Sequence, residues 1–243
     1  MLELQSFKEG KVQLITLRSA DREDVSYLDL SWKLQESLEK LNDEESTVVV
    51  LFDMSGINLQ PGMKYSDSET CSISDLLADI KFPTIGIVES GANLTVLELF
   101  LCCDIRIASN QSTFSMSHVL EGYSPIDGGT QRLPRIAGIG RAMDLLLTGR
   151  IFEAEEALGI GVVQYLFSEN VMEKAIELGC NIADHGPVAA RYLKEAILDG
   201  ADMTLEQGLR LEADLNVILQ STYDRAEGIG SFLSKKTPKY EGR

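Results

Sequence analysis

The sequence predicts an α/β fold with a helical section at its C-terminal end, and three observations lead to this prediction. Apolar runs without polar alternation, at 48–52 and 84–89, are typical of parallel strands that are covered on both faces. Residues 27–41 between such runs place leucines along one helical face. From Val171 onward the pattern is helical only, so the helices at the end of the chain follow the β/α part instead of alternating with strands.

The elements follow from these patterns in chain order. Strands are expected at 2–7, 12–17, 48–52 and 84–89, with helices at 27–41 and 73–80. After a turn at 90–93 we expect a helix beginning near Asn93 or Thr95 and a strand at 104–108. The section after Arg141 is expected to hold helices at 142–147 and 153–158, a strand at 162–166, a helix opened by Pro187 and a long helix at 205–219.

Composition limits the classes of partner. The 243 residues carry a net charge of −16, from 38 acidic against 22 basic residues. This balance argues against nucleic acid or an anionic membrane surface as the main partner. A site for a strongly anionic ligand would therefore have to gather lysine or arginine locally.

The chain shows no signal for export, for a membrane or for a metal. Its four cysteines (Cys71, Cys102, Cys103 and Cys180) lack CxxC spacing, which favours reduced thiols over disulfides or a metal site. No basic region followed by an apolar run opens the sequence, and no apolar stretch approaches the length of a membrane span. We therefore expect a cytoplasmic protein that has no membrane partner and no metal.

The residues suited to chemistry gather in the middle of the chain. Glu98 lies within the first two turns of the expected helix, close to the positive end of its dipole. A loop after the next strand carries His118, Glu121 and Asp127 and ends in Gly128-Gly129. Helix N-terminus, carboxylates and imidazole together form a plausible site for stabilising developing negative charge and for moving protons.

The chain resembles the crotonase, or enoyl-CoA hydratase/isomerase, family. The resemblance lies in CDIRIAS at 103–109, GGTQRLPRIAG at 128–138, AMDLLLTGR…EAEEALGIGVV within 142–163, and GIGSFLSKKTPKYEGR at 228–243. It implies a crotonase-like fold of ββα units in a spiral core over 1–185, followed by a helical oligomerisation segment over 186–243. It also implies a homotrimer or a dimer of trimers, and an acyl-CoA thioester as substrate. No cofactor is implied beyond the coenzyme A of that substrate.

The resemblance also assigns roles in proton transfer. Glu98 falls where the family places the first of two catalytic glutamates, although a glutamate that only interacts with the helix dipole is the alternative. His118 occupies the place of the second glutamate and can exchange a proton over a similar reach, or make ordinary polar contacts in a loop. Asp127 stands where some branches use an aspartate, but Asp-Gly-Gly is also a good turn sequence. Glu121 is an additional candidate.

Substrate-binding residues are implied in the same way. The family holds the thioester oxygen with two backbone N–H groups, which fall here on Gly62, or a neighbour, and on Thr95. The usual glycines before the first glutamate are missing from 93–97, so side chains crowd the place where the acyl group would lie. Lys64, Phe232 and Lys235 are candidates for contacts with coenzyme A, and a solvated side chain is the alternative reading for the lysines. Arg132, Arg135, Arg141 and Arg150 are expected to serve contacts between domains and subunits.

The expected function is therefore that of an acyl-CoA enzyme of the hydratase or isomerase type, acting through a thioester enolate. Several departures from the family pattern coincide: the missing glycines, His118 in place of a glutamate, Pro61-Gly62 in the other loop, and Asp127. They leave two alternatives open. One is a subunit that binds acyl thioesters or serves in assembly without turnover, and the other is an enzyme acting on carrier-protein thioesters.

Overall fold

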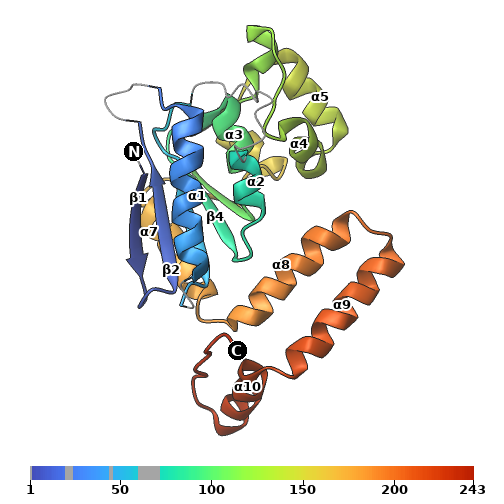
Figure 1. The fold of residues 1–243 in the computed structure, drawn as a ribbon. Coiled ribbons are helices and arrows are strands. Elements are labelled where there is room, and N and C mark those ends of the chain that lie inside the picture. The colour runs from blue at the N-terminus through green and yellow to red at the C-terminus, as the bar shows by residue number, and fades with distance from the viewer. Residues whose placement is uncertain (1, 20–23, 44–45, 60–71) are drawn as a thin grey trace.

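The computed structural model describes residues 2–19, 24–43, 46–59 and 72–243, and these are built around a six-stranded sheet (Figure 1). Its strand order is β1-β2-β3-β4-β6-β9, with β1 antiparallel to β2 and the other neighbours parallel. A second sheet has the order β5-β7-β8. The strands are β1 (Leu2–Phe7), β2 (Val12–Leu17), β3 (Val49–Asp53), β4 (Thr84–Val88), β5 (Gly91–Asn93), β6 (Ile105–Ser109), β7 (Thr113–Ser115), β8 (Ile151–Glu153) and β9 (Tyr165–Phe167).

Helices cover the large sheet and then continue to the end of the chain. A short 3₁₀ helix, η1 (Ser117–Glu121), lies between β7 and α4 in the sequence. The α-helices are α1 (Tyr27–Asp43), α2 (Ile73–Ala78), α3 (Leu94–Phe100), α4 (Gly129–Ala137), α5 (Ile139–Thr148), α6 (Ala154–Gly159), α7 (Val171–Ile182), α8 (Pro187–Ala201), α9 (Leu205–Gln220) and α10 (Tyr223–Ser234).

Both faces of the central strands are buried. All residues of β2, β3 and β4 are buried, and the apolar runs at 49–52 and 85–88 reflect this burial on both faces. Val50 and Phe52 belong to one core cluster, together with apolar residues of α1, α2 and α3. Val49 and Leu51 point to the opposite face, where α7 covers them. Strand alternation therefore divides the core into two layers around one sheet.

Most of the expected elements are present within one or two residues of their expected bounds. The strands at 2–7 and 12–17 and the helices opened by Tyr27 and Pro187 are confirmed. The helix expected at 142–147 is confirmed within α5, whereas α4, which begins at Gly129 and keeps Pro134 in its interior, was not predicted. The strand expected at 162–166 was placed too early, and β9 forms only at Tyr165.

A buried arginine explains why residues 162–164 do not join the sheet. Arg106 of β6 donates its Nε–H to the carbonyl of Val162 at 2.6 Å. Its backbone N–H and C=O are bonded to Gln164, at 2.8 and 2.9 Å. These bonds hold the segment in an irregular conformation, although Val162 and Val163 are as buried as strand residues.

The C-terminal helices extend from the β/α part of the chain. Figure 1 shows α8 and α9 as an antiparallel pair that points away from the sheet, with α10 after them. Lys194 of α8 fastens this pair by an ion pair to Asp104 at 2.8 Å and a hydrogen bond to the carbonyl of Phe82 at 3.0 Å. An apolar groove of about 1210 Å³ lies between α8, α9 and the residues around Cys102. The boundary expected at 185/186 stays a prediction.

Two further sequence expectations can be compared with the described residues. Cys102, Cys103 and Cys180 are free thiols, with Cys103 buried and the other two half-buried, while Cys71 lies outside the described residues. None of the helices in the described part of the chain is long and apolar enough to cross a lipid bilayer.

Substitution of Gly91, at the turn into β5, tests how closely the backbone before α3 is packed. Gly91 has a φ of +130°, and a Cβ there would lie 2.0 Å from the carbonyl oxygen of Thr113 on β7. We expect Gly91→Ala to lower the free energy of unfolding by about 3 kcal/mol, because backbone atoms cannot move aside as a side chain can. Gly56→Ala is the matched control, since Gly56 also has a positive φ but open space around it. Its cost should be about 1 kcal/mol. Urea unfolding measures both, and equal losses would contradict the expected clash.

Candidate active site

Glu98 is a fully buried carboxylate at the centre of the candidate site. It lies on α3, whose residues Leu97, Leu99 and Phe100 are locked into the core on the other sides of the helix. Its Oε2 accepts hydrogen bonds from the backbone N–H groups of Asp127 and Gly129, each at 2.8 Å. The two donors belong to the start of α4, so α3 and α4 are joined through this one oxygen. Its other oxygen, Oε1, has no hydrogen-bond donor among the described residues.

Gly129 can approach Glu98 this closely because it has no side chain. A Cβ at this position would lie 3.0 Å from Cγ of Glu98 and 3.1 Å from Cβ of Pro125. Such contacts would push the carboxylate away from the two N–H groups that hold it. The second glycine of the Asp-Gly-Gly sequence thus serves the site and not only a turn.

His118 lies against the free oxygen of Glu98. Its side chain is 1% exposed, and its Nε2 is 3.0 Å from Oε1 of Glu98. This is an ion-pair distance when the imidazole is protonated, but the approach is too bent for a regular hydrogen bond. The ring packs edge-on against Tyr123, with 5.3 Å between the ring centroids. The structure therefore places this histidine in a buried pair with Glu98 and not in a solvated loop.

Asp127 is the second fully buried carboxylate. Its Oδ1 accepts hydrogen bonds from Oη of Tyr27 at 2.6 Å and from Oγ of Ser72 at 2.8 Å. Its Oδ2 is buried and has no hydrogen-bond partner among the described residues. Burial, followed by the bond to this carboxylate, raises the pKa of Tyr27 above its ordinary value, so the phenol keeps its proton. Arg132 donates to the backbone carbonyl of Asp127 at 2.8 Å.

Three neighbouring side chains thus keep proton-accepting atoms free. Glu98 leaves Oε1, His118 leaves Nδ1, and Asp127 leaves Oδ2 without a hydrogen-bond partner in the described structure. Buried polar atoms are normally paired, and unpaired ones are costly unless a ligand or water completes them. The cluster is therefore able to take up, hold and return protons.

The turn before Glu98 keeps a glycine-like backbone without glycine. Leu94 has a φ of +50°, a left-handed conformation that leucine rarely adopts. The side chain of Asn93 does not cap α3, and its Oδ1 instead accepts a hydrogen bond from Oγ of Ser115 at 3.1 Å. The first N–H groups of α3, including that of Thr95, have no acceptor within the helix. Thr95 itself is buried.

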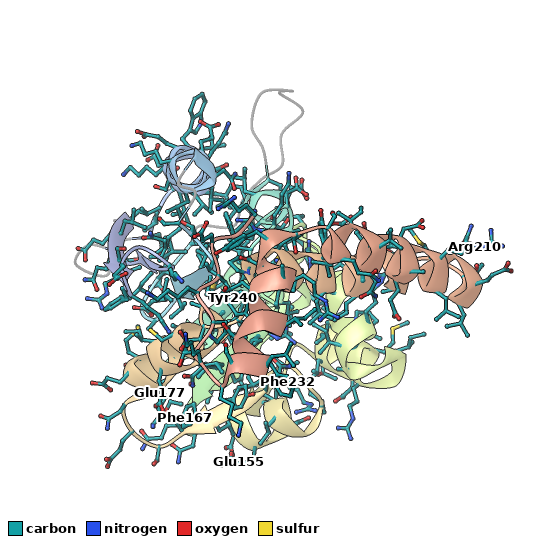
Figure 2. The ribbon with its side chains drawn as sticks, turned by 90° about the horizontal axis from the view of Figure 1, so that it is seen from below. Glu155, Phe167, Glu177, Arg210, Phe232 and Tyr240 are labelled. Atoms are coloured by element: carbon teal, nitrogen blue, oxygen red, sulfur yellow. The ribbon has the colours of Figure 1, made fainter. Side chains whose placement is uncertain are left out.

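The remaining candidates are not part of this cluster. Gly62 and Lys64 lie outside the described residues. Glu121 is exposed and contributes to the raised pKa of Tyr123, after burial of that phenol. Phe232, 82% exposed, belongs to α10, and Lys235 directly follows this helix. Figure 1 shows α10 at the opposite end of the molecule from α3, and Figure 2 shows Phe232 on that helix. Within one chain the structure does not bring them to the site.

Sequence reasoning missed Tyr27 and Ser72. Tyr27 reads as the first residue of an amphipathic helix, and Ser72 as a residue preceding another one. They are 100 and 55 residues from Asp127 in the chain. No local pattern signals such a contact.

As for metals, no cluster of His, Cys, Asp or Glu suited to an ion is found in the described ranges.

The arginines serve different purposes. Arg132 donates a hydrogen bond to the backbone carbonyl of Asp127 and so contacts the candidate site. The sequence had indicated only contacts between domains and subunits for this residue. Arg150 makes ion pairs with Asp144 and Glu156 at 2.8 and 2.5 Å. Arg135 reaches Asp202, 3.7 Å away in the segment between α8 and α9.

Comparison with known proteins gives a consistent match over the chain. A family model described as enoyl-CoA hydratase/isomerase matches residues 8–243. The 2,3-dehydroadipyl-CoA hydratase of Escherichia coli (strain K12) is 36% identical over 162 residues, which cover 66% of this chain and 64% of that protein. The mitochondrial methylglutaconyl-CoA hydratase of Mus musculus is 33% identical over 180 residues, which cover 72% of this chain and 57% of the relative. The chain thus spans between about half and two thirds of the length of these curated relatives.

The solved structures extend the match to the whole fold. The crystal structure of an enoyl-CoA hydratase from Bacillus anthracis superimposes with a TM-score of 0.88 at 32% identity, covering 100% of this chain and 99% of that one. The likeness includes the C-terminal helices, so the expected α/β spiral core with a helical C-terminal segment is confirmed.

The anchoring role of Glu98 can be tested without any substrate. We expect Glu98→Ala to lower the free energy of unfolding by about 3 kcal/mol, because it leaves the N–H groups of Asp127 and Gly129 buried without an acceptor. Glu98→Gln should cost about 1 kcal/mol, since its amide oxygen can accept both bonds. Denaturant unfolding of the two variants decides the matter. If Glu98→Gln were as unstable as Glu98→Ala, the charge and not the two acceptor bonds would be the source of the stability.

Proposed function

Because the chain belongs to the enoyl-CoA hydratase/isomerase family, the crotonase family, we propose that it acts on an acyl-CoA thioester through a stabilised enolate. The reaction type is hydration of a double bond conjugated with the thioester, or migration of such a bond. In both, a proton is moved at a carbon near the thioester carbonyl while negative charge collects on the carbonyl oxygen. Such chemistry needs proton acceptors beside hydrogen-bond donors, in a place that excludes bulk water.

One observation carries this proposal: the buried cluster of Glu98, His118 and Asp127 with free proton-accepting atoms. In the proposed reaction Glu98 exchanges a proton through Oε1, and His118, 3.0 Å away, receives or supplies it. Asp127 adds a second carboxylate with a free oxygen. A protonated His118 would also offset the charge of Glu98 in this buried setting.

The thioester oxygen is assigned to backbone donors. We place one of them at the N–H of Thr95, at the start of α3. The left-handed conformation of Leu94, with a φ of +50°, supports this assignment because it orients the turn as glycine otherwise would. Gly62, the other proposed donor, and Lys64, proposed for a phosphate of coenzyme A, lie outside the described residues. Phe232 and Lys235 are proposed to reach the coenzyme A of a neighbouring subunit. Coenzyme A enters only as part of the substrate.

The same turn favours a second candidate function. Leu94 and Thr95 carry side chains where glycine would leave room for the acyl group, and Thr95 is 2% exposed. A site that is closed in this way would bind acyl thioesters without turning them over, or serve in assembly. An enzyme that takes its thioester from a carrier protein is the further alternative.

Assembly into a homotrimer or a dimer of trimers is the partner we propose. Large apolar side chains are exposed on α5, where Ile139 is 71% and Leu147 68% exposed, and on α8, where Leu193 and Ile197 border the apolar groove. Burying such surface against a further copy is favourable.

The proposed assembly predicts the molar mass of the protein in solution. Light scattering at micromolar concentration should give about three or six times the chain mass of 26.8 kDa. Leu147→Asp, which places a charge on the exposed face of α5, should shift the population toward smaller species. A monomer mass for the wild-type chain would contradict the proposed assembly.

The catalytic prediction uses a panel of acyl-CoA esters that includes short 2-enoyl and 3-enoyl esters. Wild-type protein should hydrate or isomerise at least one of them, with product followed by mass spectrometry. Glu98→Gln should lower kcat by at least ~100-fold, since the amide cannot accept the proton. Glu155→Gln, an exposed glutamate on α6 labelled in Figure 2, is the control and should match wild type.

The outcomes separate the candidate functions. Binding of coenzyme A esters without turnover would favour the binding subunit. Turnover only of carrier-protein thioesters would favour the third possibility. Activity that is unchanged in Glu98→Gln would remove Glu98 from the mechanism.

A further inference from the structure

Asp127 is held by groups from two segments that lie far from it in the chain. Tyr27 is the first residue of α1, and Ser72 directly precedes α2. Both hydroxyl groups reach the same carboxylate oxygen, Oδ1, at 2.6 and 2.8 Å. Oγ of Ser72 is also 2.8 Å from Oγ of Ser74, and Ser72 is buried. The family match gives no role to these hydroxyl groups.

The directions of the protons in this network are fixed by simple counting. Oη of Tyr27 already accepts the backbone N–H of Ile73 at 2.9 Å, and its one hydrogen is left for Asp127. Oγ of Ser72 donates its hydrogen to Oδ1 of Asp127, so Ser74 in turn donates to Ser72. The hydroxyl groups of Tyr27 and Ser72 therefore both point toward Oδ1. Hydrogen bonds from hydroxyl groups to a carboxylate oxygen are short and strong.

The other carboxylate oxygen of Asp127 has an environment without donors. Oδ2 is buried and has no hydrogen-bond partner in the described ranges. The main chain of Asp127 is fixed as well, since its N–H bonds to Glu98 and its C=O accepts from Arg132. The carboxylate is thus held by hydrogen bonds at Oδ1, whereas its buried Oδ2 has no hydrogen-bond partner among the described residues. A group that only joined α1, α2 and α4 would have no reason to keep a bare buried oxygen.

We propose that Tyr27 and Ser72 are positioning residues that hold the Asp127 carboxyl group through Oδ1 and so direct Oδ2 as a proton acceptor of the reaction. This inference rests on the proposed acyl-CoA function. In the step concerned, a C–H bond next to the conjugated thioester system breaks, and its proton forms an O–H bond with Oδ2. The electron pair moves onto the thioester carbonyl to give the enolate. The proton later returns to carbon, so no other reactant is needed.

The test compares Tyr27→Phe and Ser72→Ala with a tyrosine control. Tyr165→Phe removes a hydroxyl from a residue of β9 that is 44% exposed and keeps the ring stacked on Phe167. On the ester that wild type turns over, each test variant should lower kcat by about ten- to a hundredfold with KM within about threefold. Ser72→Thr, which keeps the hydroxyl, should restore most of kcat.

Two further measurements separate positioning from simple damage to the fold. Tyr27→Phe combined with Asp127→Asn should be no slower than Asp127→Asn alone, since the two hydroxyls act only through this carboxylate. Infrared difference spectra of wild type minus Asp127→Asn should show carboxylate bands for Asp127 at pH 7, and these bands should shift in Tyr27→Phe but not in Tyr165→Phe. Circular dichroism of every variant checks that the helices are retained.

The results have distinct meanings. A wild-type enzyme whose kcat is unchanged by both Tyr27→Phe and Ser72→Ala would overturn the positioning role and leave the proposed function standing. Unshifted infrared bands in Tyr27→Phe would overturn it too. A wild-type protein without turnover on any ester would overturn the proposed function, and with it the proton-accepting role of Oδ2.

Discussion

The bond between the carboxylate of Glu98 and two backbone N–H groups is the constraint on which the site depends. It fixes the start of α4 against α3, and through Asp127 it also fixes the segment between η1 and α4. Asp127 can reach Tyr27 and Ser72 only because its backbone is held in this place. His118 then fills the space beside the remaining oxygen of Glu98. A single buried acceptor thus brings together segments from α1, α2, α3, η1 and α4.

Much of the fold could be predicted from the sequence because burial leaves a direct signature in the strands. β3 is apolar from Val49 to Phe52 and β4 from Ile85 to Val88, and leucines mark the buried side of α1 (Leu30, Leu34 and Leu38). One error arose where a long-range polar contact overrides the local pattern, because Arg106 keeps Val162 out of the sheet through a side-chain bond. The helix α4 was not predicted, and its interior holds Pro134, a residue that usually signals the end of a helix.

The same distinction applies to the candidate site. Glu98, His118 and Asp127 could be found because the resemblance fixes their spacing from recognisable segments, and the structure does bring these three together. Tyr27 and Ser72 could not be found, because a hydroxyl at a helix start has the same local appearance whether it faces solvent or a carboxylate 100 residues away. The turn at Leu94 shows a further limit. The sequence does not show that Leu94 adopts a left-handed conformation with a φ of +50°, which costs roughly 1–2 kcal/mol for a residue with a side chain.

In each of the two buried carboxylates, one oxygen accepts two hydrogen bonds and the other has no hydrogen-bond partner among the described residues. The kind of donor differs between them. Glu98 is held by the main-chain N–H groups of Asp127 and Gly129, and replacing the side chain of Asp127 would leave its N–H group in place. Asp127 is held by two side-chain hydroxyls, which a single substitution can remove. The position of Glu98 is therefore set by the main chain, whereas the direction of the Asp127 carboxyl group depends on two side chains outside the recognisable motifs.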